Sequence, residues 1–200
     1  MTETAAFPSD RTAVLTGAAS ARGIGRATAD RLAREGWNIA ILDIDGAAAE
    51  EAAADIAQRN GVKAIGVGAD VSDEASVDAA ISRIEAELLP IVALANLAGI
   101  SSPTEFMKET KEAWERVFAV NMTGTFLVTQ RVLHGMIDRK LGRVVSISSI
   151  SAQRGGGTYS KVAYSASKAW SGVRAPVSSS GRRDPAARPG AAVRRSSVGG

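Results

Sequence analysis

The chain has 200 residues, enough for one domain with a substantial hydrophobic core. Its 45% hydrophobic and 22% charged residues are typical of a soluble globular protein, and the lack of cysteine excludes disulfides, thiolate metal ligands and a cysteine nucleophile. No apolar run is long enough to span a membrane, and residues 1–10 lack the basic-then-apolar pattern of a signal peptide, so we expect a cytoplasmic protein with no membrane partner. The single histidine, His134, has no nucleophile placed near it by the sequence, which argues against a Ser-His-Asp hydrolase, and we expect no metal site.

The net charge of +3 is unevenly distributed along the chain. Residues 1–170 carry 18 basic and 20 acidic side chains, a net charge of −2, whereas residues 171–200 carry six arginines and one aspartate, a net charge of +5. The second segment has no helical or strand periodicity, and its Pro/Gly/Ser/Arg/Ala composition cannot bury a core. We therefore predict one domain over 1–170 and a disordered tail over 171–200. The tail has no aromatic platform beside its arginines, so we expect no nucleic-acid partner.

A glycine-rich turn follows the first predicted strand. Residues Thr12–Thr16 have the apolar, β-branched character of a buried strand, and they lead through 17–25 into a helical pattern over Arg26–Glu35. Glycines let a backbone approach a pyrophosphate, and the first turn of a helix offers unpaired N–H groups and a positive dipole. A tight turn without a ligand is the alternative. The candidate dinucleotide contacts in this turn are Gly17, Ser20, Arg22, Gly23, Ile24 and Gly25.

An acidic residue ends the second predicted strand. The strand Trp37–Leu42 runs into Asp43, 18 residues after Gly25. A carboxylate at this place accepts hydrogen bonds from the ribose hydroxyls of adenosine and repels a 2′-phosphate. Arg22 could instead contact such a phosphate. Because Asp43 lies where the ribose must bind, we favour NAD over NADP as the cofactor.

Strands and helices continue to alternate. The patterns predict a helix over Gly46–Asn60, a strand over Val62–Ala69, a helix N-capped by Ser72 and running to Glu87, and a strand over Ile91–Ala95. This alternation predicts an α/β fold with a parallel, doubly wound sheet and right-handed crossovers. Ligands of such sheets bind beyond the carboxyl ends of the strands. Further candidate cofactor contacts at that edge are Asp70, Val71, Asn96, Ala98 and Gly99.

A long helical pattern covers Thr110–Lys140. Asn121 lies at the margin of its apolar stripe, either as a core-edge asparagine satisfied by backbone groups or as a member of a proton relay. After Gly142 we expect a fifth strand over 143–148 and a flexible loop over 153–158. The residues of the predicted stripe are Trp114, Phe118, Met122, Thr125 and Val128.

A tyrosine and a lysine four residues apart suggest the chemistry of the site. On a helix, Tyr164 and Lys168 lie on one face with their polar ends adjacent. A cation beside a phenol favours the phenolate, and a tyrosine in this setting can exchange a proton with an alcohol or carbonyl oxygen. Ser149, at the end of the fifth strand, would hold that oxygen with its hydroxyl, and Ser151 is the alternative. The Tyr/Lys spacing by itself is also compatible with an ordinary exposed pair.

Together these residues resemble the motifs of the short-chain dehydrogenases/reductases. The resemblance covers residues 10 to about 170, and this part is similar to the branch of 3-oxoacyl-thioester reductases and polyol dehydrogenases. It implies a Rossmann-like fold, hydride transfer between a nicotinamide cofactor and a secondary alcohol or ketone, and a homotetramer or dimer. The motif residues, in order, are Thr16, Gly17, Gly23, Ile24, Gly25, Asp43, Asp70, Val71, Asn96, Leu97, Ala98, Gly99, Asn121, Ser149, Tyr164 and Lys168.

The resemblance also implies a role for each of four catalytic residues. Tyr164 would be the acid/base, and Ser149 would hold the substrate oxygen. Lys168 would favour the tyrosinate and bind the nicotinamide ribose, which places both Tyr164 and Lys168 among the cofactor contacts. Asn121 would support a water leading to Lys168.

This sequence departs from the family pattern in several places. The glycine turn and the interval from Ser149 to Tyr164 are each two residues longer than is common, and Leu97 replaces the second asparagine of the N-N-A-G motif. After Lys168 the family continues with a substrate loop and two further strands, which the composition of 171–200 does not match. We hypothesise a frame-shifted or truncated coding sequence that lacks these strands, leaving the fifth strand with an unpaired edge. An inactive family remnant that only binds dinucleotide or serves as an assembly partner is the alternative function.

Overall fold

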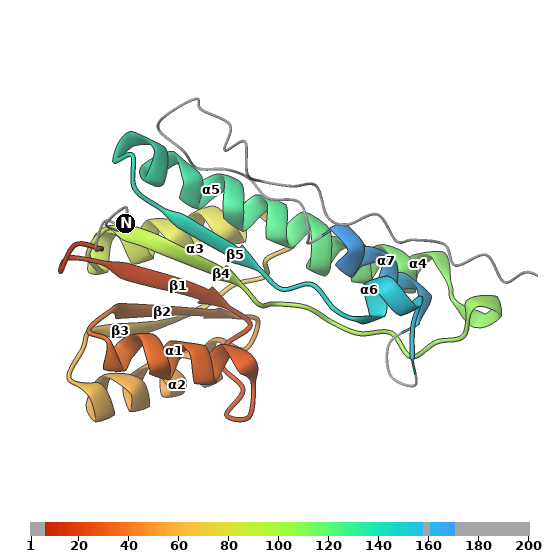
Figure 1. Cartoon of the computed structure of the whole chain (residues 1–200), viewed down its shortest axis with the longest axis horizontal. Coiled ribbons are helices and arrows are strands. Elements are labelled where there is room, and N and C mark those ends of the chain that lie inside the picture. Colours follow the sequence, from red (N-terminus) through yellow and green to blue (C-terminus); the bar gives the residue numbers. More distant parts are fainter. Residues whose placement is uncertain (1–6, 158–160, 171–200) are drawn as a thin grey trace, which may run out of the picture.

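The protein folds as one α/β domain built on a parallel sheet (Figure 1). The computed structural model describes residues 7–157 and 161–170, so the predicted disordered segment 171–200 lies outside the described residues. The sheet of the described residues has five parallel strands in the order β3-β2-β1-β4-β5, which confirms the predicted doubly wound, Rossmann-like fold. The strands are β1 (Thr12–Thr16), β2 (Asn38–Asp43), β3 (Ala64–Gly68), β4 (Ile91–Asn96) and β5 (Arg143–Ser146).

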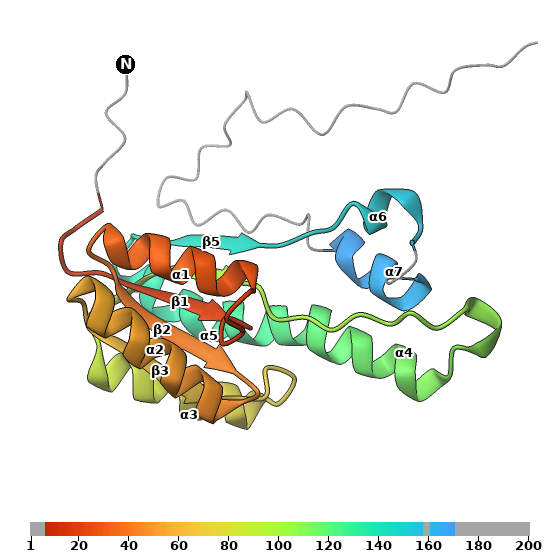
Figure 2. The same ribbon diagram turned by 90° about the horizontal axis from the view of Figure 1, so that it is seen from below.

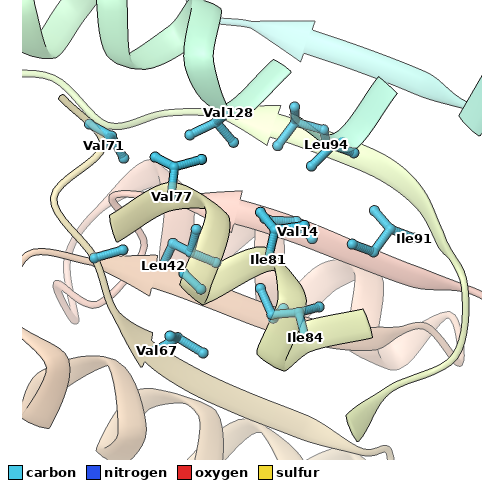
Figure 3. Close-up of a cluster of buried hydrophobic side chains, with 14 of the residues drawn as sticks. Val14, Leu42, Val67, Val71, Val77, Ile81, Ile84, Ile91, Leu94 and Val128 are labelled. Atoms are coloured by element: carbon cyan, nitrogen blue, oxygen red, sulfur yellow. The ribbon is translucent and has the colours of Figure 1, made fainter. Parts of the chain in front are cut away.

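Helices cover both faces of this sheet (Figure 1). One face carries α1 and α2, and the other carries α3 and α5. Successive side chains of a strand point to opposite faces, so β1 contributes to both cores: Leu15 packs on the α1/α2 side and Val14 on the α3/α5 side. Figure 3 shows the α3/α5 core, in which Val14 lies among Ile81, Val128 and neighbouring aliphatic side chains. These helices are α1 (Ile24–Arg34), α2 (Gly46–Asn60), α3 (Glu74–Glu87) and α5 (Thr125–Asp138).

Two smaller helices carry Tyr164 and the alternative serine, Ser151. α6 (Ser151–Arg154) and α7 (Val162–Trp170) lie together beside α4 (Lys111–Phe118), beyond the carboxyl ends of β4 and β5 (Figures 1 and 2). A short 3-10 helix, η1 (Phe106–Lys108), precedes α4. In the part of the chain that the structure describes, no helix is long and apolar enough to cross a membrane.

The predicted stripe of the long helix is confirmed at Val128 and wrong at its earlier positions, which are at most half-buried. The helical stretch consists of α4, a π-helical segment η2 (Ala119–Gly124) and α5. Trp114 and Phe118 are only half-buried and stack on each other, with ring centroids 4.5 Å apart. A π-helical turn adds a residue per turn, so one α-helical stripe cannot describe both the residues before it and the residues after it. The residues that face the interior are Val117, Asn121, Gly124, Val128, Val132 and Met136.

Three local predictions also need correction. Asp73, and not Ser72, caps α3, because the Asp73 carboxylate accepts a hydrogen bond from the Ala75 N–H. The fifth strand ends at Ser146, two residues earlier than expected, where its pairing with β4 stops. The start of the predicted 153–158 loop belongs to α6, a single helical turn that Gly155 ends in a left-handed conformation.

Candidate functional site

The glycine turn is packed too closely for side chains at two of its positions. Gly17 has a φ of +65°, and a Cβ there would lie 2.6 Å from the Ala98 Cα. A Cβ on Gly25 would lie 2.7 Å from the Ala18 Cα, so the start of α1 rests directly on the turn. The two extra residues of the turn, with Arg22 as the second, are exposed. The longer turn therefore bulges into solvent and leaves the strand–turn–helix arrangement intact.

Thr16 joins this turn to the end of β4. Its Oγ1 accepts hydrogen bonds from the N–H groups of Leu97 and Ala98, both at 3.0 Å. The sequence analysis includes Thr16 in the family motif but gives it no task. The hydroxyl fixes the ends of β1 and β4 side by side, which places Gly17 next to Ala98.

Asp43 is held at the end of β2 by backbone groups. Its Oδ2 accepts from the Ala19 N–H at 3.1 Å, and its Oδ1 accepts from the Asp45 N–H at 3.4 Å. A carboxylate has about four acceptor positions. Asp43 can therefore bind the glycine turn and still accept hydrogen bonds from a ligand.

A pocket of about 430 Å³ opens at the carboxyl edge of the sheet. It brings together six of the predicted cofactor contacts: Gly17, Asp43, Asp70, Val71, Ala98 and Gly99. The remaining turn residues Ser20, Arg22, Gly23, Ile24 and Gly25 do not line it, and neither do Asn96, Tyr164 and Lys168. Arg116, Ala119 and Val120 form a further wall of the pocket and are not among the predicted contacts. These three residues follow one another at helical spacing, but the predicted stripe had directed attention to a different face of the helix.

Asn96 turns away from the pocket. Its buried amide donates to the Thr129 Oγ1 at 2.9 Å and to the Ser146 Oγ at 3.3 Å. These bonds join β4 to α5 and β5. In this structure Asn96 therefore supports the frame around the pocket and does not reach into it.

Lys168 is buried and reaches towards the pocket wall. Only 5% of it is exposed, and this burial lowers the pKa of its ammonium group from the ordinary 10.5. The Nζ donates to the Ile147 carbonyl at 3.3 Å and lies 5.9 Å from the centroid of the Tyr164 ring. A Cβ on Gly99 would lie 3.3 Å from the same Nζ. Lys168 thus connects the tyrosine to Gly99, which lines the pocket.

Asn121 is fully buried inside the π-helical turn. Its Oδ1 accepts from the Ile100 N–H at 2.9 Å, and its Nδ2 donates to the Ile100 carbonyl at 3.0 Å and to the Ser167 Oγ at 2.9 Å. Ser167 donates in turn to the Tyr164 carbonyl at 2.8 Å. The asparagine therefore couples the segment after β4 to the helix that carries Tyr164. Nothing in the spacing of Ser167 distinguishes it from an ordinary helical serine, which is why the sequence analysis did not select it.

The candidate serines lie where the segment that follows β5 enters α6. Ser149 is half-buried, and its Oγ accepts from the Ser151 N–H at 3.2 Å. Ser151 is also half-buried and begins α6. The neighbouring Ser148 donates to the Lys168 carbonyl at 2.9 Å and so ties this segment to α7.

Comparisons with known proteins show the family of the chain. Residues 11–175 match the model of the short chain dehydrogenase family. The chain belongs to the short-chain dehydrogenase/reductase family. It is 41% identical over 150 residues to the 3-oxoacyl-[acyl-carrier-protein] reductase of Aquifex aeolicus, covering 75% of this chain and 60% of that protein. It is 38% identical over 149 residues to the 5-keto-D-gluconate 5-reductase of Escherichia coli, covering 74% and 58% of the two chains.

Solved structures of the short-chain dehydrogenase/reductase family superpose on the fold. An NAD+-bound xylitol dehydrogenase has a TM-score of 0.74 at 32% identity, covering 82% of this chain and 61% of that one. A 3-ketoacyl-ACP reductase from Sinorhizobium meliloti also has a TM-score of 0.74, at 34% identity, covering 80% and 62%. The chain therefore spans about 60% of the length of these relatives.

The residues at the pocket suit the nicotinamide cofactor that this family uses. A Cβ on Gly17 would lie 2.6 Å from the Ala98 Cα, and a Cβ on Gly99 would lie 3.1 Å from the Asn121 Oδ1, so glycine lets these groups lie close together beside the pocket. Asp43 supplies hydrogen-bond acceptors and Asp70 a second carboxylate, both within the same lining. The arrangement can hold a pyrophosphate at the turn, a ribose at Asp43 and a base beyond it.

Proposed function

We propose that the protein is an NAD-dependent oxidoreductase that interconverts a secondary alcohol and a ketone. The observation that carries the proposal is the position of Lys168. Its Nζ lies over the ring of Tyr164 and next to Gly99, so a proton-transfer group adjoins one end of the pocket.

Different residues along the pocket bind different parts of the cofactor. The glycine turn binds the pyrophosphate, Asp43 binds the adenosine ribose, and Asp70 with Val71 borders the base. When bound, the nicotinamide ring supplies the hydride chemistry. The substrate oxygen lies against Tyr164, which gives it a proton in the reductive direction and takes one in the oxidative direction.

Three residues support that proton transfer. Lys168 donates to the nicotinamide ribose, and its positive charge stabilises the tyrosinate that remains after reduction. Ser149, or Ser151 in its place, donates a hydrogen bond to the substrate oxygen. Asn121 holds Ile100 and Ser167 in place and supports a water leading to Lys168.

The choice of NAD over NADP follows from Asp43. Its carboxylate lines the pocket and would face a 2′-phosphate with like charge. Arg22 is exposed on the bulge of the turn and could offset part of that repulsion. The NAD+ in the related xylitol dehydrogenase is consistent with this preference.

The substrate class proposed is a 3-oxoacyl thioester or a polyol. Both classes occur among the relatives, as a 3-oxoacyl-carrier reductase and a xylitol dehydrogenase. We also propose a cytoplasmic homo-oligomer, dimer or tetramer, on the basis of the family resemblance.

The test is a spectrophotometric assay of the full chain with NADH and a panel of ketones, keto-sugars and 3-oxoacyl thioesters. We expect loss of the reduced-nicotinamide absorbance with at least one member of the panel. Replacing Tyr164 by Phe should slow this turnover by about 10²–10⁴-fold while NADH binding persists. If the folded chain turns over no member of the panel, the oxidoreductase proposal fails.

A second candidate function is dinucleotide binding without turnover. One relative in Xanthobacter autotrophicus is named an inactive 2-(S)-hydroxypropyl-CoM dehydrogenase, 43% identical over 135 residues and covering 68% of this chain and 56% of that protein. NADH binding measured by calorimetry, together with no turnover in the same panel, would favour this candidate.

A further inference from the structure

The base end of the pocket carries an arginine to which the proposed roles assign no task. Arg116 lines the pocket from the last turn of α4, and Ala119 and Val120 line it as well. Residues three and four apart share one face of a helix, so these three side chains form a continuous wall. The other charged side chains of the lining are Asp43 and Asp70.

Asp70 presents one carboxylate oxygen to a ligand. The N–H and the hydroxyl of Ser72 both donate to Oδ1, at 2.9 and 2.6 Å, so Oδ2 can accept from a bound group. These two bonds, and more weakly the positive charge of Arg116, hold the pKa of Asp70 below its usual range. Asp70 is therefore an acceptor only, whereas the guanidinium of Arg116 is a donor only. A ligand in this part of the pocket meets an acceptor at Asp70 and a donor at Arg116.

We propose that Arg116 is a specificity residue that donates a hydrogen bond to a ring nitrogen of adenine, beside the amino group accepted by Asp70. This inference rests on the proposed dinucleotide function. In adenine the 6-amino donor is flanked by two acceptors, N1 and N7. An acceptor and a donor that line the same pocket can match either of these edges. Arg116 approaches from the α4 wall, and Asp70 approaches from the segment that follows β3.

The experiment compares three ligands on the full chain by isothermal titration calorimetry: 5′-AMP, its 1-deaza analogue and its 7-deaza analogue. Each analogue replaces one ring nitrogen by carbon and keeps the phosphate, ribose and amino group. We expect one of the two analogues to bind about tenfold more weakly than 5′-AMP, the loss of one charge-assisted hydrogen bond. In Arg116→Gln, 5′-AMP and that analogue should bind with equal affinity.

The matched control is Lys111→Gln, which removes a positive charge from the exposed first turn of the same helix. It should keep the discrimination of the native chain. An equal loss of affinity for all three ligands in Arg116→Gln would overturn the inference, because it would show a general effect of charge. Unchanged binding in that variant, or no discrimination by the native chain, would overturn it as well. If the native chain binds neither NADH nor 5′-AMP, the proposed function itself fails, and this result is distinct from the others.

Discussion

The Nζ of Lys168 donates to the backbone carbonyl of Ile147 at 3.3 Å. This bond joins α7 to the segment that leaves β5, so the lysine is positioned by the end of the sheet as well as by its own helix. Its ammonium group keeps two further donors. A tyrosine and a ribose hydroxyl are the partners that we propose for them.

Replacing Lys168 by Met should separate chemistry from folding. The methionine fills a similar volume without charge, so the buried site stays packed. We expect turnover in the NADH assay to fall by about 10²-fold or more, because the tyrosinate loses its cation. Thermal unfolding should show that the variant is at least as stable as the native chain. A variant with native turnover would exclude a role for Lys168 in proton transfer.

The same lysine predicts a pH dependence of stability. Burial lowers the pKa of Lys168 in the folded state below the ordinary 10.5 of the unfolded chain. Between these two values the unfolded state binds more protons than the native state, so the free energy of unfolding rises with pH. The contribution is constant below the lowered native pKa and above the unfolded value.

The measurement is urea unfolding of the native chain and Lys168→Met over a pH series reaching 10.5. Taking the difference between their free energies of unfolding at each pH removes the contribution of the other titrating groups. We expect the native chain to gain stability relative to the variant as pH rises through this window. A difference that stays flat would show that the ammonium group is hydrated in the folded state.

Asp43→Asn tests the choice of cofactor. The amide keeps the shape of the side chain but loses the charge that favours ribose hydroxyls and repels a 2′-phosphate. We expect NADH to bind about tenfold more weakly and the preference over NADPH to shrink, as measured by calorimetry. The control is Asp45→Asn at the exposed N-cap of α2, where the side chain accepts from the Ala48 N–H and does not line the pocket. Equal effects of the two substitutions would contradict the assignment of the ribose to Asp43.

Asn121→Ala should be strongly destabilising. The substitution leaves the N–H and the carbonyl of the half-buried Ile100 without the side-chain partners they now have. We expect a loss of about 2–5 kcal/mol in the free energy of unfolding from denaturant titration. The control is Asn60→Ala in α2, whose amide donates to the Ile56 carbonyl and to Asp30 near the surface, with an expected loss of about 1 kcal/mol. A loss for Asn121→Ala no larger than that of the control would remove the structural role given to this residue.

The parts of the fold that depend on local patterns could be predicted from the sequence. The strands around Val14 and Ile41 are short apolar runs bounded by glycine or charge, and each lies where its pattern predicts. Asp43 and Gly99 reach one pocket because parallel strands end at one edge of the sheet. Tyr164 and Lys168 share a face of α7 because residues four apart on a helix lie on the same side.

The parts of the fold and of the site that depend on contacts between distant segments could not be predicted from the sequence. The π-helical turn at Asn121 changes which face of the following helix points to the interior. No residue pattern in the sequence indicates this change of helical period. Arg116 lines the pocket because of the way α4 packs beside it. A charged residue in a helical pattern gives no sign of such a position. Thr16 and Ser167 act through single hydrogen bonds to residues far away in the sequence.

The way α7 is attached affects which part of the protein unfolds first. Hydrogen bonds attach α7, and Lys161 just before it, to the segments around them: the Ser148 hydroxyl to the Lys168 carbonyl, the Lys168 Nζ to the Ile147 carbonyl, Asn121 to Ser167, and the Lys161 N–H to the Ser102 carbonyl. The sheet and its two cores contain none of these groups. A local fluctuation that detaches α7 would carry the tyrosine and lysine away while the nucleotide pocket stays folded. As the denaturant concentration rises, enzyme activity would then be lost before the domain unfolds. Backbone amide hydrogens would also exchange faster in α7 than in β1.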